Sequence, residues 1–121
     1  RRRREIRPLL ERLFSDPSLV THQLAGDVLR YKRLDGVEEA LATIAGRLVV
    51  DGRQAVGFRE RLPEYPGPTL AIWGAEDGVV PPTHGEGLPA SVRVEVLPGA
   101  GHMPMMEAAA RVNRLLLEAM G

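Results

Sequence analysis

Two titratable residues, Asp77 and His102, each follow a segment that the sequence pattern predicts to be a β-strand. Asp77 comes four residues after the apolar run Thr69–Trp73, and His102 comes six residues after Val96, near the end of an alternating segment. A carboxylate can accept the Nδ1–H of an imidazole, which fixes the tautomer and stabilises the imidazolium that forms during proton transfer. The Nε2 atom of His102 would then be free to act as a general base.

Each of these residues also has a simpler interpretation. Asp77 precedes a glycine, and Asp-Gly pairs are common in ordinary turns. His102 could be a loop histidine without a catalytic role. Glu76 is a rival carboxylate, although its side chain begins one residue earlier and would point differently. The order and the placement of Asp77 and His102 favour the catalytic interpretation, whereas His22 and His84 have no such setting and are expected to be surface or packing residues.

The nucleophile that such a pair would activate is not evident in this sequence. The chain has three serines, Ser15, Ser18 and Ser91, and no cysteine. None of the serines lies in a Gly-x-Ser-x-Gly turn, which exposes the hydroxyl in one large class of acyl-transferring enzymes. In that class the chain order is serine, acid, histidine. We therefore expect the serine to lie upstream of Arg1, and we note that the chain does not start with Met.

The elements that would position Asp77 and His102 form the second half of the chain. Thr69–Trp73 is a continuous apolar run, which predicts a strand covered on both faces. A short helix is expected from Pro82 to about Leu88, a second strand over Ser91–Leu97, and a helix over Glu107–Met120. The expected buried stripe of that helix is Ala108, Val112, Leu115, Leu116 and Met120. Such alternation predicts an α/β arrangement with parallel strands and helical crossovers.

The first half of the chain has the pattern of helices. Three are expected before residue 50, and a fourth, weaker one over Gln54–Leu62. The apolar stripe of the first consists of Ile6, Leu9, Leu10, Leu13 and Phe14, and that of the third consists of Val37, Leu41, Ile44, Ala45 and Leu48. Three prolines between residues 63 and 68 mark a boundary. The predicted division is therefore a helical segment, 1–65, and a strand–helix segment, 66–121.

Composition narrows the possible classes of function. Lysine and arginine total 16 and aspartate and glutamate total 16, so the formal net charge of zero argues against a nucleic-acid-binding protein. The four arginines at the start are followed by no interleaved aromatic residues, and no apolar run is long enough to predict a membrane span. The absence of cysteine excludes disulfides and cysteine-ligated zinc, and it fits a reducing compartment, so a cytoplasmic location is expected. No metal site is predicted.

Two motifs resemble those of the α/β-hydrolase family. The stretch from Pro68 to Pro81 resembles the strand and loop that bear the triad acid in that family, and Pro98–Glu107 resembles its histidine loop. By position, the resemblance makes Asp77 the triad acid and His102 the triad histidine. The helical first half is similar to the cap that the family inserts before these strands. The implied fold is α/β, a helical cap followed by a partial parallel sheet with helices.

A narrower resemblance concerns the first half. Asp27–Leu41, together with Gly52–Gln54, is similar to the hydrolase-like acyltransferases of acetoin dehydrogenase complexes. This resemblance implies acyl transfer, or ester hydrolysis by a serine enzyme, with lipoate on a separate domain and no cofactor in this chain. Because the nucleophile turn, the oxyanion-hole loop and the other core strands of the family are missing from the sequence, the chain is expected to be inactive alone.

Two further expectations concern the pocket and the partners. Val80 and Met103 could line a substrate pocket, the alternative for each being ordinary loop or core packing. Because the apolar strand Thr69–Trp73 needs neighbours and a two-stranded sheet is marginal in water, we expect a homo-oligomer, most simply a dimer. The rest of a hydrolase core or dehydrogenase complex subunits are alternative partners. A non-catalytic interaction module, or a self-assembling protein built on this fold, is the alternative to an enzyme.

Overall fold

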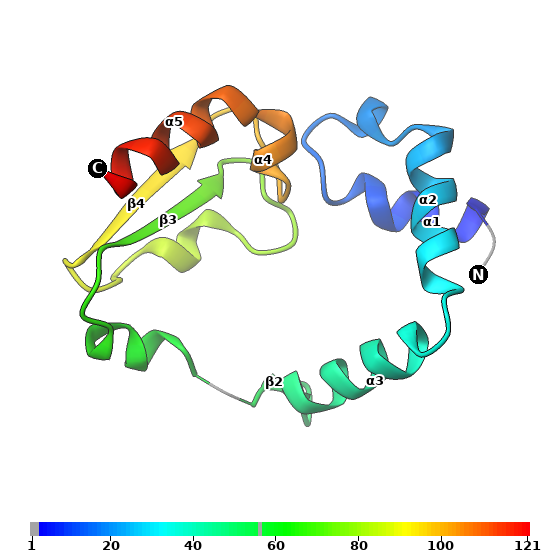
Figure 1. Cartoon of the computed structure of the whole chain (residues 1–121), viewed down its shortest axis with the longest axis horizontal. Coiled ribbons are helices and arrows are strands. Elements are labelled where there is room, and N and C mark those ends of the chain that lie inside the picture. The colour runs from blue at the N-terminus through cyan, green and yellow to red at the C-terminus, as the bar shows by residue number, and fades with distance from the viewer. Residues whose placement is uncertain (1–2, 56) are drawn as a thin grey trace.

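The computed structural model describes residues 3–55 and 57–121, and their elements are arranged in a ring around a central opening (Figure 1). The first side of the ring contains α1 (Arg3–Glu11), the 3₁₀ helix η1 (Pro17–Leu19) and α2 (His22–Lys32). The connecting segment contains α3 (Val37–Leu48), β1 (Val49–Val50), β2 (Arg53–Gln54) and η2 (Arg59–Glu64). The last side contains β3 (Thr69–Gly74), η3 (Pro82–Gly85), β4 (Val92–Leu97), α4 (Pro104–Glu107) and α5 (Ala109–Met120).

Helices α1 and α2 pack together because each has one apolar face. Their shared core consists of Ile6, Leu10, Phe14, Val20, Ala25 and Leu29. The turn between the helices is formed by local caps, since the side chain of Asp16 accepts the Ser18 N–H at 2.9 Å and that of Thr21 accepts the Leu24 N–H at 3.1 Å. The predicted stripe of α1 is confirmed except at Leu9, which is 46% exposed because no described element covers that side of the helix.

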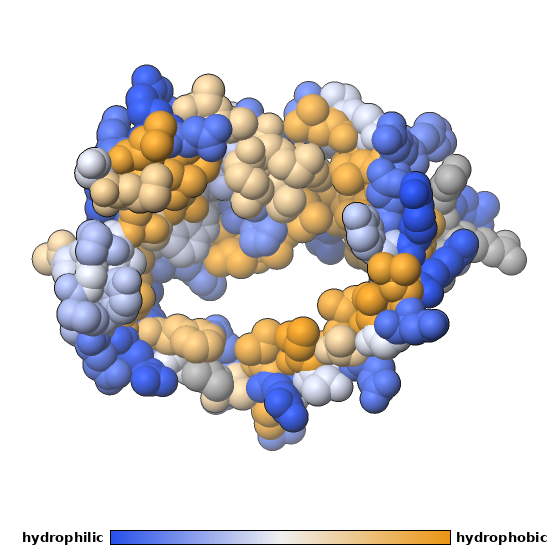
Figure 2. Space-filling model, viewed as in Figure 1, coloured by the Kyte–Doolittle hydropathy of each residue, from blue (hydrophilic) through white to orange (hydrophobic). Residues whose placement is uncertain are grey.

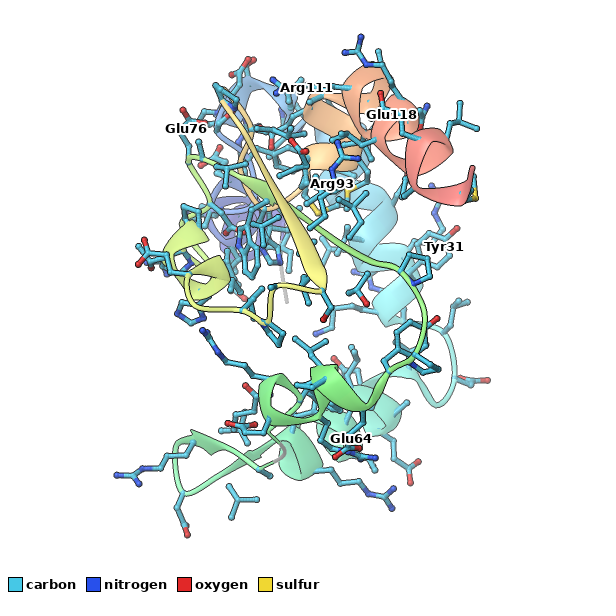
Figure 3. The ribbon with its side chains drawn as sticks, turned by 90° about the vertical axis from the view of Figure 1, so that its left-hand side faces the viewer. Tyr31, Glu64, Glu76, Arg93, Arg111 and Glu118 are labelled. Atoms are coloured by element: carbon cyan, nitrogen blue, oxygen red, sulfur yellow. The ribbon has the colours of Figure 1, made fainter. Side chains whose placement is uncertain are left out.

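Strands β3 and β4 pair in parallel, as the alternation of elements predicts. Thr69 is opposite Val92 and Gly74 is opposite Leu97, so both strands end at the same edge of the sheet. One face is covered by α5 through Val112 and Leu115, around Leu97 and Ala100. The C-terminal end of α5 is bound to β4 by an ion pair in which Arg93 Nη2 lies 3.4 Å from Glu118 Oε2 (Figure 3).

The side chains of β3 and α5 are less buried than the sequence predicts. The first five residues of β3 are only half-buried, although the apolar run predicts cover on both faces. In α5, Leu116 is 45% exposed and Met120 is 75% exposed, contrary to the predicted stripe. The sheet formed by the described residues has only two strands, so it is too narrow to cover the whole apolar surface of β3 and α5.

The connecting segment contradicts the predicted burial most clearly. Helix α3 has no buried residue, and Leu41, Ile44 and Leu48 are 49%, 53% and 42% exposed. Ala45 is exposed as well, and Val37 is only half-buried. Figure 2 shows apolar side chains along this segment, beside an opening at the centre of the molecule. The apolar stripe of α3 is present, but the described part of the chain leaves every residue of this helix exposed or only half-buried.

Three predicted helices differ from the observed elements. The helix predicted over Gln54–Leu62 is replaced by the β1–β2 hairpin and by η2. Asp51 and Gly52 have φ angles of 51° and 72°, which is the two-residue turn that favours a hairpin. The helix predicted from Pro82 is a 3₁₀ turn, and the helix predicted over Glu107–Met120 begins two residues later, as α5, after the short helix α4. No helix in the described residues has the length and apolarity of a membrane span. The division between residues 65 and 66 stays a prediction.

Candidate active site

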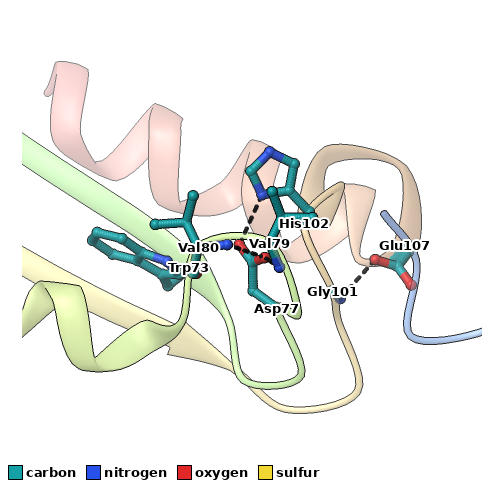
Figure 4. A network of polar contacts seen from close by, with 7 residues as sticks. All are labelled: Trp73, Asp77, Val79, Val80, Gly101, His102 and Glu107. Atoms are coloured by element: carbon teal, nitrogen blue, oxygen red, sulfur yellow. Dashed lines mark hydrogen bonds and ion pairs between the residues drawn. The ribbon is translucent and has the colours of Figure 1, made fainter. Parts of the chain in front are cut away.

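Asp77 and His102 lie together at the edge of the sheet where β3 and β4 end (Figure 4). The Oδ2 atom of Asp77 is 2.9 Å from Nδ1 of His102. The other carboxylate oxygen, Oδ1, accepts the backbone N–H groups of Val79 and Val80 at 2.8 and 2.9 Å. Asp77 is only 8% exposed, whereas the His102 side chain is 35% exposed and open to a reacting group.

The charge of Asp77 decides which atom carries the proton in this pair. Burial alone would raise the pKa of the Asp77 carboxyl, but hydrogen bonds from Val80, His102 and Val79 together hold that pKa below its ordinary value. The carboxylate is therefore ionised at neutral pH, and Nδ1 of His102 must be the donor. The Nε2 atom of a neutral imidazole is then left with a lone pair that can accept a proton.

The two loops are held in place by backbone contacts at the ends of β3 and β4. The Ala75 N–H donates to Leu97 O at 2.9 Å, and the Glu76 N–H donates to Ala100 O at 3.0 Å. A Cβ atom at Gly74 would lie 2.0 Å from Gly101 O, so only glycine permits this close approach. The two loops therefore behave as one unit that fixes the separation of the carboxylate and the imidazole.

Trp73 holds the acid loop from the opposite side. Its indole Nε1–H donates to Val80 O at 2.8 Å (Figure 4). Val80 is therefore bonded through its carbonyl oxygen to Trp73 and through its N–H to Asp77. The strand residue Trp73 thus fixes the turn whose N–H groups orient the carboxylate.

A second carboxylate, Glu107, binds the histidine loop to the turn after α1. Its Oε2 atom accepts the Gly101 N–H at 2.7 Å, and its Oε1 atom accepts the Ser15 N–H at 2.6 Å. The Ser15 hydroxyl lies 2.7 Å from Glu107 Oε1 and 2.8 Å from Gly99 O, and its single proton can serve one of these acceptors at a time. Glu107 therefore joins segments that are 92 residues apart.

The pKa of Glu107 is also lowered. Burial would raise the pKa, but the Ser15 hydroxyl and the backbone N–H groups of Gly101, Ser15 and Asp16 outweigh that effect. A Cβ atom at Gly101 would lie 2.7 Å from Ser15 N and 2.9 Å from Phe14 C, so the backbone of the α1 turn passes directly against the residue before His102. The histidine loop is thus packed and hydrogen-bonded against the helical side of the ring.

The structure brings Asp77 and His102 together and separates the other candidates from them. The side chain of Glu76 is exposed and points away from the molecule (Figure 3), while its backbone N–H bonds Ala100 O. His22 and His84 are exposed. In the described part of the chain, His102 makes its only side-chain hydrogen bond with Asp77. The rival carboxylate therefore does not occupy the position beside the imidazole.

Val80 and Met103, which the sequence suggests as pocket residues, both have structural roles. Val80 is half-buried and orients Asp77 through its backbone. Met103 packs against the core of α1 and α2. Their contribution to a substrate pocket stays a prediction.

Sequence reasoning missed Glu107 and Ser15 as parts of the site. The sequence does point to Glu107, because this acidic residue ends the Pro98–Glu107 motif and lies five residues after His102. No such feature points to Ser15, because its serine–aspartate–proline context is typical of a helix boundary.

The described residues supply no nucleophile beside His102. The hydroxyl of Ser15 is held by Glu107 and Gly99, and His102 has no hydrogen bond to a hydroxyl. Among the same residues, no group of three or more His, Cys, Asp or Glu side chains is arranged to hold a metal ion. The described site can orient an imidazole and accept a proton on it.

Comparisons with known proteins identify the family of this chain. Residues 1–115 match the model of the "Alpha/beta hydrolase family". The chain is 43% identical, over 119 residues, to the dihydrolipoyllysine-residue acetyltransferase component of the acetoin cleaving system of Cupriavidus necator, covering 98% of this chain and 32% of that protein. It is 30% identical, over 127 residues, to a 2-hydroxy-6-oxononadienedioate/2-hydroxy-6-oxononatrienedioate hydrolase of Burkholderia vietnamiensis, covering 91% of this chain and 44% of that protein.

A solved structure of a related hydrolase has a similar fold over the matched residues. The chain superimposes on a mutant of the meta-cleavage product hydrolase CumD from Pseudomonas fluorescens IP01, complexed with acetates, with a TM-score of 0.81 and 28% identity. The match covers 98% of this chain and 45% of that structure. The chain thus spans from about a third to just under a half of the length of these proteins.

Proposed function

This chain belongs to the alpha/beta hydrolase family, and we propose that Asp77 and His102 are the acid and the base of a catalytic triad in acyl chemistry. The observation that carries the proposal is the 2.9 Å contact between a buried carboxylate and an imidazole that follow two neighbouring parallel strands. Ligands of open parallel sheets bind beyond the carboxyl ends of the strands, which is where this pair lies.

The role of each group follows from the geometry. Asp77 Oδ2 holds the Nδ1–H of His102, so that Nε2 is presented without a proton. A serine hydroxyl placed at Nε2 would transfer its proton there while its oxygen forms a bond to the acyl carbon. The imidazolium, stabilised by the Asp77 carboxylate, then returns the proton to the leaving group as the tetrahedral intermediate collapses to an acyl-enzyme. Water or another nucleophile, deprotonated by the same imidazole, then attacks the acyl carbon, and the imidazolium returns the proton to the serine oxygen as the acyl–serine bond breaks.

The second nucleophile distinguishes a hydrolase from an acyltransferase. The Cupriavidus relative is named for acetyl transfer to a dihydrolipoyllysine residue, and the Burkholderia relative is named as a hydrolase. Lys32, the single lysine of this chain, lies in the last turn of α2 with Nζ 3.5 Å from Glu38 Oε1. By analogy with the acetyltransferase, we propose that a lipoyl group would reach His102 as a substrate carried on a separate domain. The higher identity to the acetyltransferase favours acyl transfer over hydrolysis.

The 121 residues alone are proposed to be inactive, because a base without a nucleophile forms no acyl-enzyme. A serine-directed fluorophosphonate probe tests this directly, and we expect no labelling of the chain. Labelling would show that one of its own serines is activated and would overturn the assignment of an external nucleophile.

A chimera tests the proposed chemistry. The matched residues of the Cupriavidus necator protein are replaced by this chain, and hydrolysis of p-nitrophenyl acetate and fluorophosphonate labelling are measured. We expect the chimera to react with both, and His102→Ala to lower the turnover by about 10⁴-fold or more. His84→Ala is the matched control, since His84 is exposed and away from Asp77. A folded chimera that is inactive, or one that is indifferent to His102→Ala, would contradict the proposal.

We also propose that the chain associates through its apolar surface, with a second copy as the simplest partner. The observation that favours this is the row of exposed apolar side chains on α3 and β1, where Ile44 is 53% exposed and Val49 is 55% exposed. The β3–β4 sheet adds two strand edges that no described residue pairs with. The rest of a hydrolase core, or a subunit of a dehydrogenase complex, would cover the same surfaces.

A further inference from the structure

We infer that Glu107 is a positioning residue, which fixes the His102 imidazole on Asp77 by tying the histidine loop to the turn after α1. This inference rests on the proposed role of His102. The motivating contacts are those of the two carboxylate oxygens, Oε2 with Gly101 N at 2.7 Å and Oε1 with Ser15 N at 2.6 Å.

The contact with Gly101 acts on the residue that directly precedes the imidazole. Gly101 is buried, and its N–H has Glu107 as its acceptor. This N–H belongs to the peptide unit between residues 100 and 101, and rotation of that unit would displace Gly101 and carry the ring of the next residue away from Asp77. Because the Gly101 N–H is held by Glu107, the ring is restricted to the position in which Nδ1 meets Oδ2.

The contact with Ser15 anchors the Glu107 carboxylate to the turn after α1. Ser15 follows Phe14, which is buried in the core of α1 and α2. The same turn lies close to the backbone of Gly101, since a Cβ atom at Gly101 would lie 2.7 Å from Ser15 N. Glu107 therefore connects His102 to a packed helical core as well as to its own short helix, α4. In this way the helical side of the ring determines the position of the imidazole.

Only a carboxylate of this length satisfies both contacts. Each of its oxygens accepts from a different segment, and its lowered pKa keeps both oxygens as acceptors at neutral pH. In Glu107→Gln one acceptor oxygen becomes an NH₂ group, which would face a backbone N–H and be unable to bond it. The variant keeps the size of the side chain, so it tests the second acceptor and not the packing.

The experiment uses the intact 121-residue chain and needs no turnover. The ¹⁵N shifts of the His102 ring, recorded with the imidazole neutral, identify which nitrogen carries the proton. We expect the wild-type chain to show the Nδ1–H tautomer and Glu107→Gln to show a mixture. Hydrogen exchange should become at least about tenfold faster at the amide of Gly101 or of Ser15, whichever then faces the NH₂ group and has lost its acceptor. Glu64→Gln, at an exposed glutamate paired with Arg61, is the control and should change neither.

Ser15→Ala keeps the inference falsifiable if Glu107→Gln fails to fold. It removes the hydroxyl contact but keeps the N–H contact, so a smaller change of both readouts is expected. The inference is overturned if Glu107→Gln folds and keeps the wild-type tautomer, or if it unfolds and Ser15→Ala leaves both readouts unchanged. A wild-type chain that lacks the Nδ1–H tautomer would instead contradict the proposed function, so the two failures are distinguishable.

Discussion

Asp77 shows how one side chain can have a structural and a catalytic role together. Its Oδ1 atom accepts two backbone N–H groups and so forms the turn that an Asp-Gly pair predicts. Its Oδ2 atom meets His102. The sequence presents these as competing interpretations of Asp77, and the structure contains the geometry of both. The division between two oxygens of one carboxylate cannot be predicted from residue spacing.

Asp77→Asn should separate the two roles. If the amide oxygen takes the place of Oδ1, the turn keeps its acceptor, while the NH₂ group faces Nδ1 and forces the wrong tautomer. In the active chimera kcat should fall by about 10⁴-fold, while the melting temperature changes little. Steady-state kinetics and thermal unfolding measure the two effects. Near-normal kcat in this variant would exclude Asp77 as the triad acid.

The lowered pKa of Glu107 predicts a pH dependence of stability. A carboxyl whose pKa is lower in the folded state than in the unfolded state contributes stability above its unfolded value, near pH 4, and that contribution is lost as the pH falls through the folded value. Urea unfolding of the wild-type chain should therefore show a stability that declines below about pH 4, and Glu107→Gln should decline less over the same range. Equal pH dependence in the two proteins would show that Glu107 is not stabilised by its hydrogen bonds.

At the scale of elements, the strands and loops around the site were predictable and the burial of the helices was not. The apolar run of β3 and the alternation in β4 predict parallel neighbours, and their pairing places both loops at one edge. The stripe of α3 shows that one face is apolar, but a stripe does not identify what covers it, and in the described chain nothing does. The β1–β2 hairpin escapes prediction because the Asp51–Gly52 pair fits a break between helices as well as a two-residue hairpin turn.

Two glycines provide a matched test of how the loops are held. In Gly101→Ala the new Cβ would meet backbone atoms of Ser15 and Phe14 at 2.7 and 2.9 Å, and these cannot move without displacing the α1 turn. We expect a loss of about 1–3 kcal/mol in the free energy of unfolding. Gly46→Ala lies inside α3 with nothing within 4 Å of the new atom, so it should be neutral or stabilising by up to about 1 kcal/mol. Equal effects in urea titrations would refute the close packing at Gly101.

At the scale of the whole molecule, the described residues form two small apolar cores, and the segment that joins these cores has no buried residue among those described. One core belongs to α1 and α2, and the other belongs to the β3–β4 sheet and α5. The ring is closed where Met103 packs on the first core and Glu107 binds Ser15. This closure could not be predicted from the sequence, because it depends on contacts between segments that are 84 and 92 residues apart.

Unpaired strand edges and exposed apolar side chains predict self-association of the isolated chain. Sedimentation equilibrium at micromolar concentration should give a dimer, and Ile44→Glu, which places a charge on the exposed apolar side of α3, should shift the equilibrium toward the 13.2 kDa monomer. Thr43→Glu, at an exposed polar position of the same helix, is the control. A cooperatively folded wild-type monomer that does not aggregate would contradict the proposed association.

The protonation of the His102 ring tests the pairing with Asp77 most directly. In the ¹⁵N spectrum of the wild-type chain, with the imidazole neutral, the proton should reside on Nδ1, because the ionised Asp77 carboxylate is 2.9 Å away. Asp77→Asn should move it to Nε2. A wild-type ring protonated on Nε2, or one whose tautomer does not respond to Asp77→Asn, would show that the two residues are not the acid and base of one catalytic site.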